Sequence, residues 1–194
     1  MRKVIDILMM IVLLLVMAYP FTGQSIHIVL GIMMVVCFLI HHYLNRRWYL
    51  SLFKGKMTPV KALFIGTNSL LLICVLAIAL SGLTLAGYIP LMSYYLARKL
   101  HLVCSYWSYL LMGLHVGLHV RVNQLIKNKI VIYVLLILGV ILFIKNQFIV
   151  YLFHLTDFLY VSDQMNIVLY IIEYFIIFIL FVILMNEIIK ELRK

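Results

Sequence analysis

Residues His27 to Trp48 read HIVLGIMMVVCFLIHHYLNRRW and are the most informative part of the sequence about its fold. Their apolar run is close to the ~20 residues that a helix needs to cross ~30 Å of hydrocarbon. One histidine begins the stretch, His41 and His42 end the apolar run, and a basic, aromatic segment follows at once. Because an imidazole at membrane depth is costly, histidines placed in this way indicate a function and not only packing.

The composition of the whole chain extends this observation. Of its 194 residues, 66% are hydrophobic and only 11% are charged, whereas a soluble domain is about half apolar and about a quarter charged. The sequence therefore predicts an all-α, integral membrane protein of about six transmembrane helices. We expect these spans at residues 4–20, 24–45, 60–86, 94–120, 130–150 and 165–187.

The basic residues predict the orientation of these spans. Thirteen of the 16 lysines and arginines lie at one set of span ends, and the positive-inside rule assigns that side to the cytoplasm. We therefore expect a multi-pass protein of the cell membrane with both termini cytoplasmic. The first apolar run has no small-residue cleavage pattern near Pro20 and is expected to be a retained helix and not a signal peptide. The net charge of +10 comes from basic residues that flank the spans and do not form a soluble basic face. It therefore does not predict nucleic-acid binding.

Two pairs of histidines share one spacing. The interval from His27 to His41 equals the interval from His101 to His115. It is about 14 residues, which rise about 21 Å along a helix and return to nearly the same face. Two of the expected spans therefore carry two imidazoles each, one near either membrane surface. Because these spans run in the same direction, we expect His27 and His101 at the outer level, and His41 and His115 at the inner level.

Two facing imidazoles at each of two levels suit two haem b groups, each held by axial nitrogens from two helices. A structural zinc site is a poorer match, because it needs four ligands at one point. For any single histidine the alternative is a plain hydrogen bond between helices. Two alternates for the inner haem also stay open. They are His42, beside His41, and His119, which follows His101 by about five helical turns and lies about 6 Å deeper than His115.

The two histidine-bearing spans resemble a weak internal repeat. Aligning His27 with His101 also brings His41 onto His115. If the repeat is real, each of these spans forms a hairpin with the span that precedes it. The domains expected on this basis are 1–125, a four-helix haem-binding bundle, and 126–194, a C-terminal two-helix transmembrane hairpin.

Cationic residues near the four histidines are candidate partners for haem propionates. On the inner side these are Arg46, Arg47 and Arg121, although positive-inside anchoring accounts for them equally well. On the outer side, where that rule predicts few basic residues, Arg98 and Lys99 lie three and two residues before His101. Contact with the outer propionates, or with an anionic partner, would explain them, and the plainer alternative is a solvated helix end.

Several other residues have plainer explanations. Asp6, at the start of the first span, is expected at the membrane interface. Gly113 and Gly117 bracket one histidine and fit either a flat macrocycle or close helix packing. The three cysteines fall inside spans and form no C-x-x-C pair, so they predict buried apolar residues and not a disulfide or thiol redox motif. Lys145 and Glu173 have similar expected depths and are predicted to pair.

The quoted stretch, His27 to Trp48, resembles the flavinylation-associated cytochrome family, and its most specific part is H-x-x-L-N-R-R-W. The segment KLHLVCSYWSYLLMGLHVGLH, Lys99 to His119, is similar to the second histidine-bearing helix of related four-helix b-type cytochromes. The resemblance covers about residues 1–125. It implies a di-haem membrane cytochrome that passes electrons across the bilayer, with the axial ligands His27, His41, His101 and His115.

The resemblance also implies partners. The electron donor would be a membrane quinol or another reduced carrier, and the acceptor would be an extracytosolic protein that carries covalent flavin. This chain shows no flavinylation motif, so any such flavin would belong to the partner. Whether the chain is an enzyme stays open, with the membrane cytochrome b subunit of an oxidoreductase as one answer. The alternative functions are a small membrane transporter or channel with a histidine-lined polar pathway, and a haem-binding sensor or assembly factor.

Overall fold

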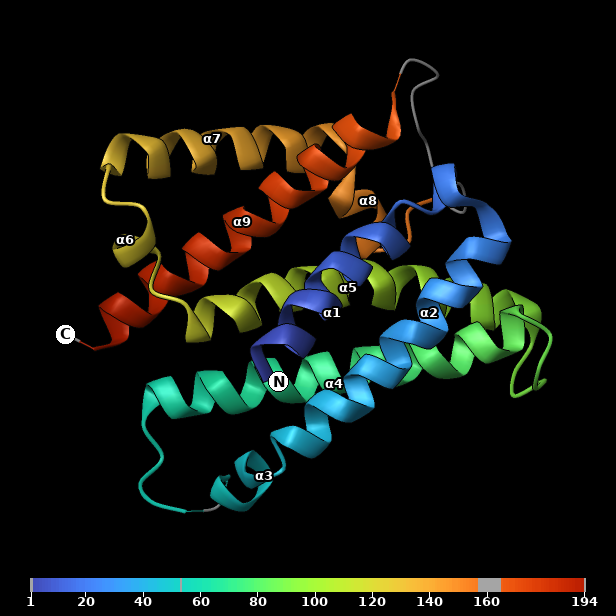
Figure 1. The fold of residues 1–194 in the computed structure, drawn as a ribbon, viewed down its shortest axis with the longest axis horizontal. Helices are drawn as coiled ribbons and strands as arrows, with labels where there is room; N and C mark the ends of the chain where they lie inside the picture. Colours follow the sequence, from blue (N-terminus) through green and yellow to red (C-terminus); the bar gives the residue numbers. More distant parts are fainter. Residues whose placement is uncertain (1, 53, 157–164, 194) are drawn as a thin grey trace. The chain divides into compact units, whose positions relative to one another are not determined.

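The structure is a computed structural model that describes residues 2–52, 54–156 and 165–193. Within these ranges the chain is helical and has no strand, which confirms the all-α prediction (Figure 1). Three of the helices are short: α3 (Arg47–Ser51), α6 (Val122–Leu125) and α8 (Phe148–Leu152). The long helices are α1 (Arg2–Met17), α2 (Tyr19–Leu44), α4 (Pro59–Leu85), α5 (Tyr94–His119), α7 (Lys129–Lys145) and α9 (Ile167–Leu192).

Three of the long helices, α2, α4 and α9, are long and apolar enough to cross a membrane. That is what a multi-pass membrane protein requires. α1 and α7 have 16 and 17 residues, a little short of the ~20 that span ~30 Å of hydrocarbon. α5 has 26 residues, but Arg98, Lys99 and three histidines make it more polar. Each expected span coincides with a long helix, and six membrane crossings stay a prediction.

A backbone break lies just before one expected span and another lies inside a second one. α2 contains a non-helical residue, Gly23, with φ 72°, a conformation that glycine adopts readily because it has no Cβ. Regular helix therefore starts close to the predicted residue 24. The span predicted at 130–150 is too long, since α7 ends at Lys145 and Gln147 adopts a left-handed φ of 54° before α8 begins.

Polar caps define the starts of the helices that follow loops. A side-chain oxygen of Thr58, Ser93 or Asn128 accepts a hydrogen bond from a backbone N–H in the first turn of α4, α5 or α7, respectively. Each cap satisfies one of the backbone donors that a helix start leaves without an intrahelical partner. These signals are local in sequence, so the predicted helix starts lie close to the observed ones.

The chain divides into two compact units. The first contains the residues up to Lys56 and the start of α9 as far as Ile171, and the second contains α4 to α8 and the rest of α9. Within the first unit, α1 and α2 form an antiparallel hairpin, and within the second, α4 and α5 form another (Figure 1). The two hairpins predicted from the repeat are thus confirmed. The predicted domain division after residue 125 stays a prediction.

Glycines allow α9 to pack closely on its neighbours in the second unit. A Cβ added to Gly113 of α5 would lie 2.8 Å from the Cβ of Phe181, and one added to Gly117 would lie 2.6 Å from the carbonyl oxygen of Val182. Gly139 of α7 makes the same kind of close approach to α9. Such contacts are typical of small residues between membrane helices. Of the two explanations for Gly113 and Gly117, the structure shows close helix packing.

The predicted pairing of Lys145 with Glu173 is confirmed. Lys145 Nζ donates to Glu173 Oε1 at 2.5 Å, and Asn146 Nδ2 donates to Glu173 Oε2 at 2.8 Å. Glu173 is only 5% exposed, and a buried carboxylate is tolerated only with such partners. The pair ties the end of α7 to the beginning of α9.

An aromatic cluster fastens α8 onto α5 and α9. Tyr106 stacks on Tyr151 with ring centroids 4.6 Å apart, and Tyr109 donates its hydroxyl hydrogen to the backbone carbonyl of Tyr174 at 2.5 Å. All four tyrosines are buried, and so is Phe148. The C-terminal helices therefore hold the face of α5 that carries Tyr106 and Tyr109, and the same helix carries two of the candidate histidines.

Candidate functional site

The four candidate ligands lie on the two helices where they were predicted. His27 and His41 are on α2, and His101 and His115 are on α5. In all four, ring atom Nδ1 faces an oxygen atom of the helix that precedes it in the same hairpin. This shared contact is the main feature of the site.

In the first hairpin, α1 supplies both oxygen atoms. His27 Nδ1 lies 3.1 Å from the backbone oxygen of Val16, and His41 Nδ1 lies 2.8 Å from Asp6 Oδ1. Tyr19 packs edge-on against the His27 ring with the centroids 5.1 Å apart. The expectation that Asp6 is only an interfacial residue is wrong, because its carboxylate reaches across the hairpin to the inner histidine.

In the second hairpin, α4 supplies the oxygen atoms. His101 Nδ1 lies 3.2 Å from the backbone oxygen of Ile78 and 3.2 Å from Ser81 Oγ. The Ser81 hydroxyl donates to the backbone of its own helix, so its oxygen accepts from the imidazole. His115 Nδ1 lies 2.7 Å from Asn68 Oδ1.

The two hairpins repeat one hydrogen-bond pattern. In each, the first histidine faces a backbone carbonyl and the second faces a side-chain oxygen. The partners are 11 and 35 residues before their histidines in the first hairpin, and 23 and 47 residues before them in the second. Both separations therefore grow by the same amount from the first hairpin to the second. With the histidines aligned, Val16 matches Ile78 and Asp6 matches Asn68 once the turn of the second hairpin is taken to be about 12 residues longer than that of the first, which is compatible with an internal repeat.

The contacts determine where each imidazole carries its proton. Carbonyl and carboxylate oxygens only accept hydrogen bonds, so Nδ1 of the neutral ring carries the hydrogen. Nε2 then holds the lone pair that can coordinate a metal ion. Histidines that bind metals characteristically donate their other ring N–H to a carboxylate or a backbone carbonyl, which orients the ring. The chemistry of all four histidines therefore fits an axial ligand of haem iron.

Gly82 of α4 leaves room for the outer imidazole of α5. A Cβ added to Gly82 would lie 3.3 Å from His101 Cε1. That distance is tighter than most van der Waals contacts, so alanine at this position would require the His101 ring to shift by a few tenths of an ångström. No role at the site was predicted for this glycine from the sequence.

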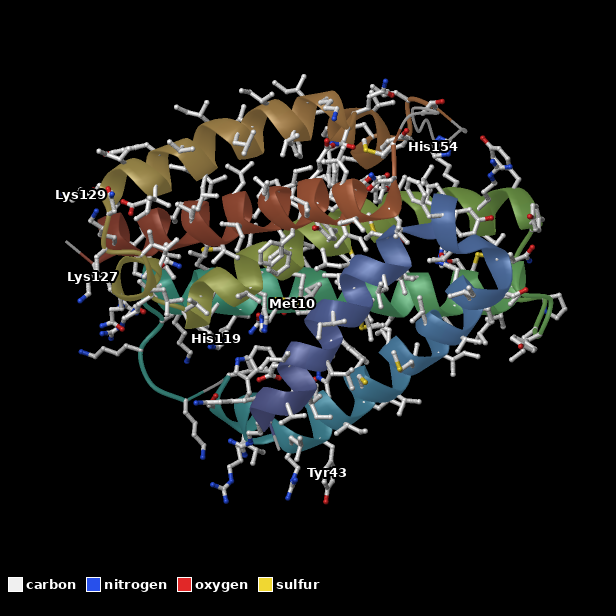
Figure 2. All side chains as sticks on the ribbon, turned by 45° about the horizontal axis from the view of Figure 1, so that its top comes forward. Met10, Tyr43, His119, Lys127, Lys129 and His154 are labelled. Carbon is white, nitrogen blue, oxygen red and sulfur yellow. The ribbon has the colours of Figure 1, made fainter. Side chains whose placement is uncertain are left out.

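The two alternate ligands have different surroundings. His42 Nδ1 bonds the hydroxyl of Tyr49, and a tyrosine hydroxyl can either donate or accept. His119 lies at the C-terminal end of α5 (Figure 2), with its ring centroid 5.5 Å from that of Phe64 and 5.0 Å from that of His115. These contacts do not fix the proton on Nδ1. The geometry therefore favours the histidines with obligate acceptors as the inner ligands.

The cationic candidates for propionate contacts lie at helix ends, namely Arg46, Arg47, Arg98, Lys99 and Arg121. Arg46, which lies between α2 and α3, turns back onto the end of α2. Its Nη1 donates to the backbone oxygen of Tyr43 at 3.0 Å, and its guanidinium carbon lies 4.5 Å from the Tyr43 ring centroid. This bond satisfies a carbonyl at the C-terminal end of α2. Propionate contacts for the five residues stay predictions.

In the predicted arrangement, each haem takes one axial histidine from each hairpin. His27 and His41 belong to the first compact unit, and His101 and His115 belong to the second. The pairing of these helices at matched depths stays a prediction. Over the part of the chain that the structure describes, no three His, Cys, Asp or Glu side chains come together as a metal site, and a haem with two axial nitrogens does not need such a cluster.

The residues that sequence reasoning missed are the oxygen partners. No role was predicted for Asn68 or Ser81, and Asp6 was assigned to the interface. These partners could have been predicted. A metal-binding imidazole needs a hydrogen-bond acceptor for its second nitrogen, and in a hairpin the preceding helix is the element that can supply it. Polar residues of the preceding apolar span, such as Asn68 and Ser81, were the ones to examine.

Comparisons of the chain with protein-family models, with curated proteins and with solved structures found no match. The resemblance to flavinylation-associated cytochromes therefore rests on residues 27–48 and 99–119. Independent support for a function comes from the histidine contacts within the two hairpins.

Proposed function

We propose that this chain is a membrane cytochrome that binds two haem b groups and transfers electrons across the bilayer. His27 and His101 would hold the outer haem, and His41 and His115 would hold the inner one. Nε2 of each ring is the coordinating atom. A bound haem b supplies reversible one-electron chemistry at its iron.

One observation carries the proposal: the same pair of Nδ1 hydrogen bonds recurs in both hairpins. A histidine that merely packs between helices can donate from either nitrogen. Four histidines at a repeated spacing, each with Nδ1 on an oxygen, have the support typical of metal ligands. The two levels are separated along each helix by about 21 Å, which spreads the redox centres over most of the bilayer.

The chain's own residues have defined tasks in this proposal. Val16, Asp6, Asn68 and the Ile78–Ser81 turn orient the imidazoles and keep the proton on Nδ1. The carboxylate of Asp6 makes its imidazole a stronger donor than a neutral acceptor would. The basic residues at helix ends would neutralise the propionates.

The direction and partners proposed here are those that the resemblance to flavinylation-associated cytochromes implies. With both termini cytoplasmic, the chain would take electrons from a membrane quinol or another reduced carrier and pass them to an extracytosolic flavin-bearing protein. It would then serve as the membrane cytochrome b subunit of an oxidoreductase. Membrane lipid would surround the apolar helices, and six crossings would allow the four helices of the two hairpins to form one bundle.

The test is a reduced-minus-oxidised absorption spectrum of the protein, purified from membranes of haem-supplied cells, with haem counted per chain. We expect a b-type signal and about two haems per chain. His27→Ala or His101→Ala should each lower this to about one. His154→Asn is the matched control, because His154 has φ 52°, which asparagine tolerates, and it is no candidate ligand.

A purified, well-folded protein without any b-type haem signal would overturn the proposal. Two haems retained in both His27→Ala and His101→Ala would overturn the outer ligand assignment. A haem-free protein that moves protons or solutes in vesicles would instead favour the histidine-lined transporter.

A further inference from the structure

The C-terminal end of α5 has no stop signal of its own. α5 ends at His119, and Val120 leaves the helix with an extended backbone, although residues 118–128 include neither glycine nor proline. A helix end leaves backbone carbonyls without intrahelical partners, and glycine or a nearby proline commonly marks it. At this break the partner comes from another helix, α9.

One amide side chain of α9 joins both sides of the break. Asn186 Nδ2 donates to the backbone oxygen of Gly117 at 2.8 Å, and the backbone N–H of Val122 donates to Asn186 Oδ1 at 2.9 Å. Nδ2 also donates to the backbone oxygen of Val182, in α9 itself, at 3.2 Å. Because backbone oxygens only accept and backbone N–H groups only donate, these bonds fix which end of the amide is nitrogen. Asn186 thus satisfies the last turn of α5 and the first turn of α6.

Close packing brings Asn186 to this position. A Cβ added to Gly117 would lie 2.6 Å from the backbone oxygen of Val182 and 2.7 Å from the Cβ of Met185. Buried apolar residues form a cluster at the same level, namely Leu118, Met185 and Ile189. Asn186 therefore lies where the backbones of α5 and α9 are already close, within reach of both sides of the break.

The candidate ligand His115 lies beside this anchored turn. It precedes Gly117 by two residues, and its Nδ1 lies 2.7 Å from Asn68 Oδ1 of α4. α5 is therefore held from two sides at this level, by α4 through the imidazole and by α9 through the backbone. The other histidine of α5 in the site, His101, lies about four turns earlier in the helix, and its partners belong to α4 alone.

We propose that Asn186 is a positioning residue for the inner haem: by fixing where α5 ends, it holds His115 against Asn68 and in place for ligation. This inference rests on the proposed function. Without the amide, the last turn of α5 unwinds or continues toward α6, and His115 loses its fixed relation to Asn68. His101 is too far along the helix to respond. Removing the amide should therefore affect one haem and not the other.

The haem test uses full-length proteins that each hold one haem. His27→Ala should retain only the inner haem and His41→Ala only the outer one, and both substitutions leave α5 unchanged. Asn186→Leu, a side chain of similar size, removes all three bonds. With the inner haem alone, it should weaken haem binding about 10-fold, the lower end of the range for losing a direct partner of a ligand, and shift the reduction potential. With the outer haem alone, haem titration and redox potentiometry should show no change.

Hydrogen exchange tests the helix end separately from the haem. In the His41→Ala background neither protein holds the inner haem, so a difference in exchange cannot come from its loss. Asn186→Leu should lose protection at the backbone amides of residues 118–126 and keep it at residues 97–105. Asn166→Leu is the matched control. Asn166 Oδ1 accepts the N–H of Leu169 at 2.8 Å at the opposite end of α9, so this variant also loses an asparagine bond but leaves the end of α5 intact.

Four results would contradict the inference. Lost protection with an unchanged inner haem would make Asn186 a cap of α5 without a positioning role. Unchanged protection would show that the amide does not set the end of α5. Equal weakening of both haems, or the same weakening in Asn166→Leu, would indicate general destabilisation. A wild-type protein without haem would overturn the proposed function and the positioning role with it, whereas two haems that do not respond to Asn186→Leu would overturn the positioning role alone.

Discussion

His115 of α5 donates its Nδ1 hydrogen to Oδ1 of Asn68 in α4, 2.7 Å away, just as His41 of α2 donates to Asp6 of α1 at 2.8 Å. The two inner histidines thus have equivalent partners of different charge. One partner is an amide and the other is a carboxylate. This difference allows the partners to be exchanged and their effects on the inner site to be measured.

Removing the acceptor of His115 should loosen the inner haem. Asn68→Leu leaves Nδ1 without this oxygen, and loss of such a partner typically costs about 10- to 100-fold in metal affinity. Asn68→Asp keeps an oxygen and adds negative charge, so it should retain the haem and lower its reduction potential. Haem titration and redox potentiometry measure both effects. Asn128→Ser, which keeps a helix cap, is the control, and an Asn68→Leu protein with unchanged affinity and potential would refute the role of this bond.

The inner ligands can be separated from their neighbours by single substitutions. His41→Ala and His115→Ala should each lower the haem content from about two to about one. His42→Ala and His119→Ala should leave it at about two, because the proposal assigns the inner haem to His41 and His115, whose Nδ1 atoms face the acceptor oxygens of Asp6 and Asn68. Haem counting on purified protein gives the answer. Loss of a haem in the His42 or His119 variant, with retention in its neighbour's, would reverse the assignment.

The close packing of α5 on α9 predicts a stability difference between two glycines. Gly117→Ala places a Cβ 2.6 Å from the backbone oxygen of Val182, and overpacking of this kind costs about 1–3 kcal/mol. Gly31→Ala meets nothing within 4 Å, and it should be neutral or stabilise by up to about 1 kcal/mol because alanine favours helix. Thermal unfolding in detergent compares the two. Equal midpoints for both variants would contradict the observed packing.

The Lys145–Glu173 pair should matter more than a pair on an exposed helix end. Lys145→Met leaves the buried carboxylate with the Asn146 amide as its partner, and because the Lys145 side chain is 51% exposed we expect a loss of about 1–3 kcal/mol, below the full cost of breaking a buried pair. Lys145→Met combined with Glu173→Gln should recover most of the loss. Lys190→Met breaks an exposed pair with Glu187 and should be close to neutral. A Lys145→Met protein as stable as the Lys190→Met protein would argue against the pair's contribution.

Much of the fold could be predicted because it depends on local patterns. Apolar runs of sufficient length predict the helices, and Thr58, Ser93 and Asn128 mark their starts as caps. The end of α7 at Lys145 was missed, because the apolar run continues past Gln147 and no proline or glycine marks the break. Gln147 adopts a left-handed conformation there, and a sequence does not indicate such a conformation when the residue is not glycine.

For the candidate site, the sequence predicted the histidines but not the oxygen atoms that accept their hydrogen bonds. The shared interval of about four helical turns places His27 with His41, and His101 with His115, on one face of a helix through helical periodicity alone. Their acceptors lie 11 to 47 residues away on other helices. Those distances include the turns between helices, and helical periodicity carries no information about turn length.

Composition and helical periodicity were enough to predict an apolar, helical chain with four histidines at matching positions on two helices, each of which pairs with the helix before it. The packing of the helices was needed to show that Asp6 and Asn68 contact equivalent histidines, and that Gly113 and Gly117 serve the contact with α9. The difference comes from the register between packed helices, which the periodicity of a single helix does not contain. Periodicity sets which residues share a face of one helix, whereas the alignment of two packed helices along their axes sets which side chains meet.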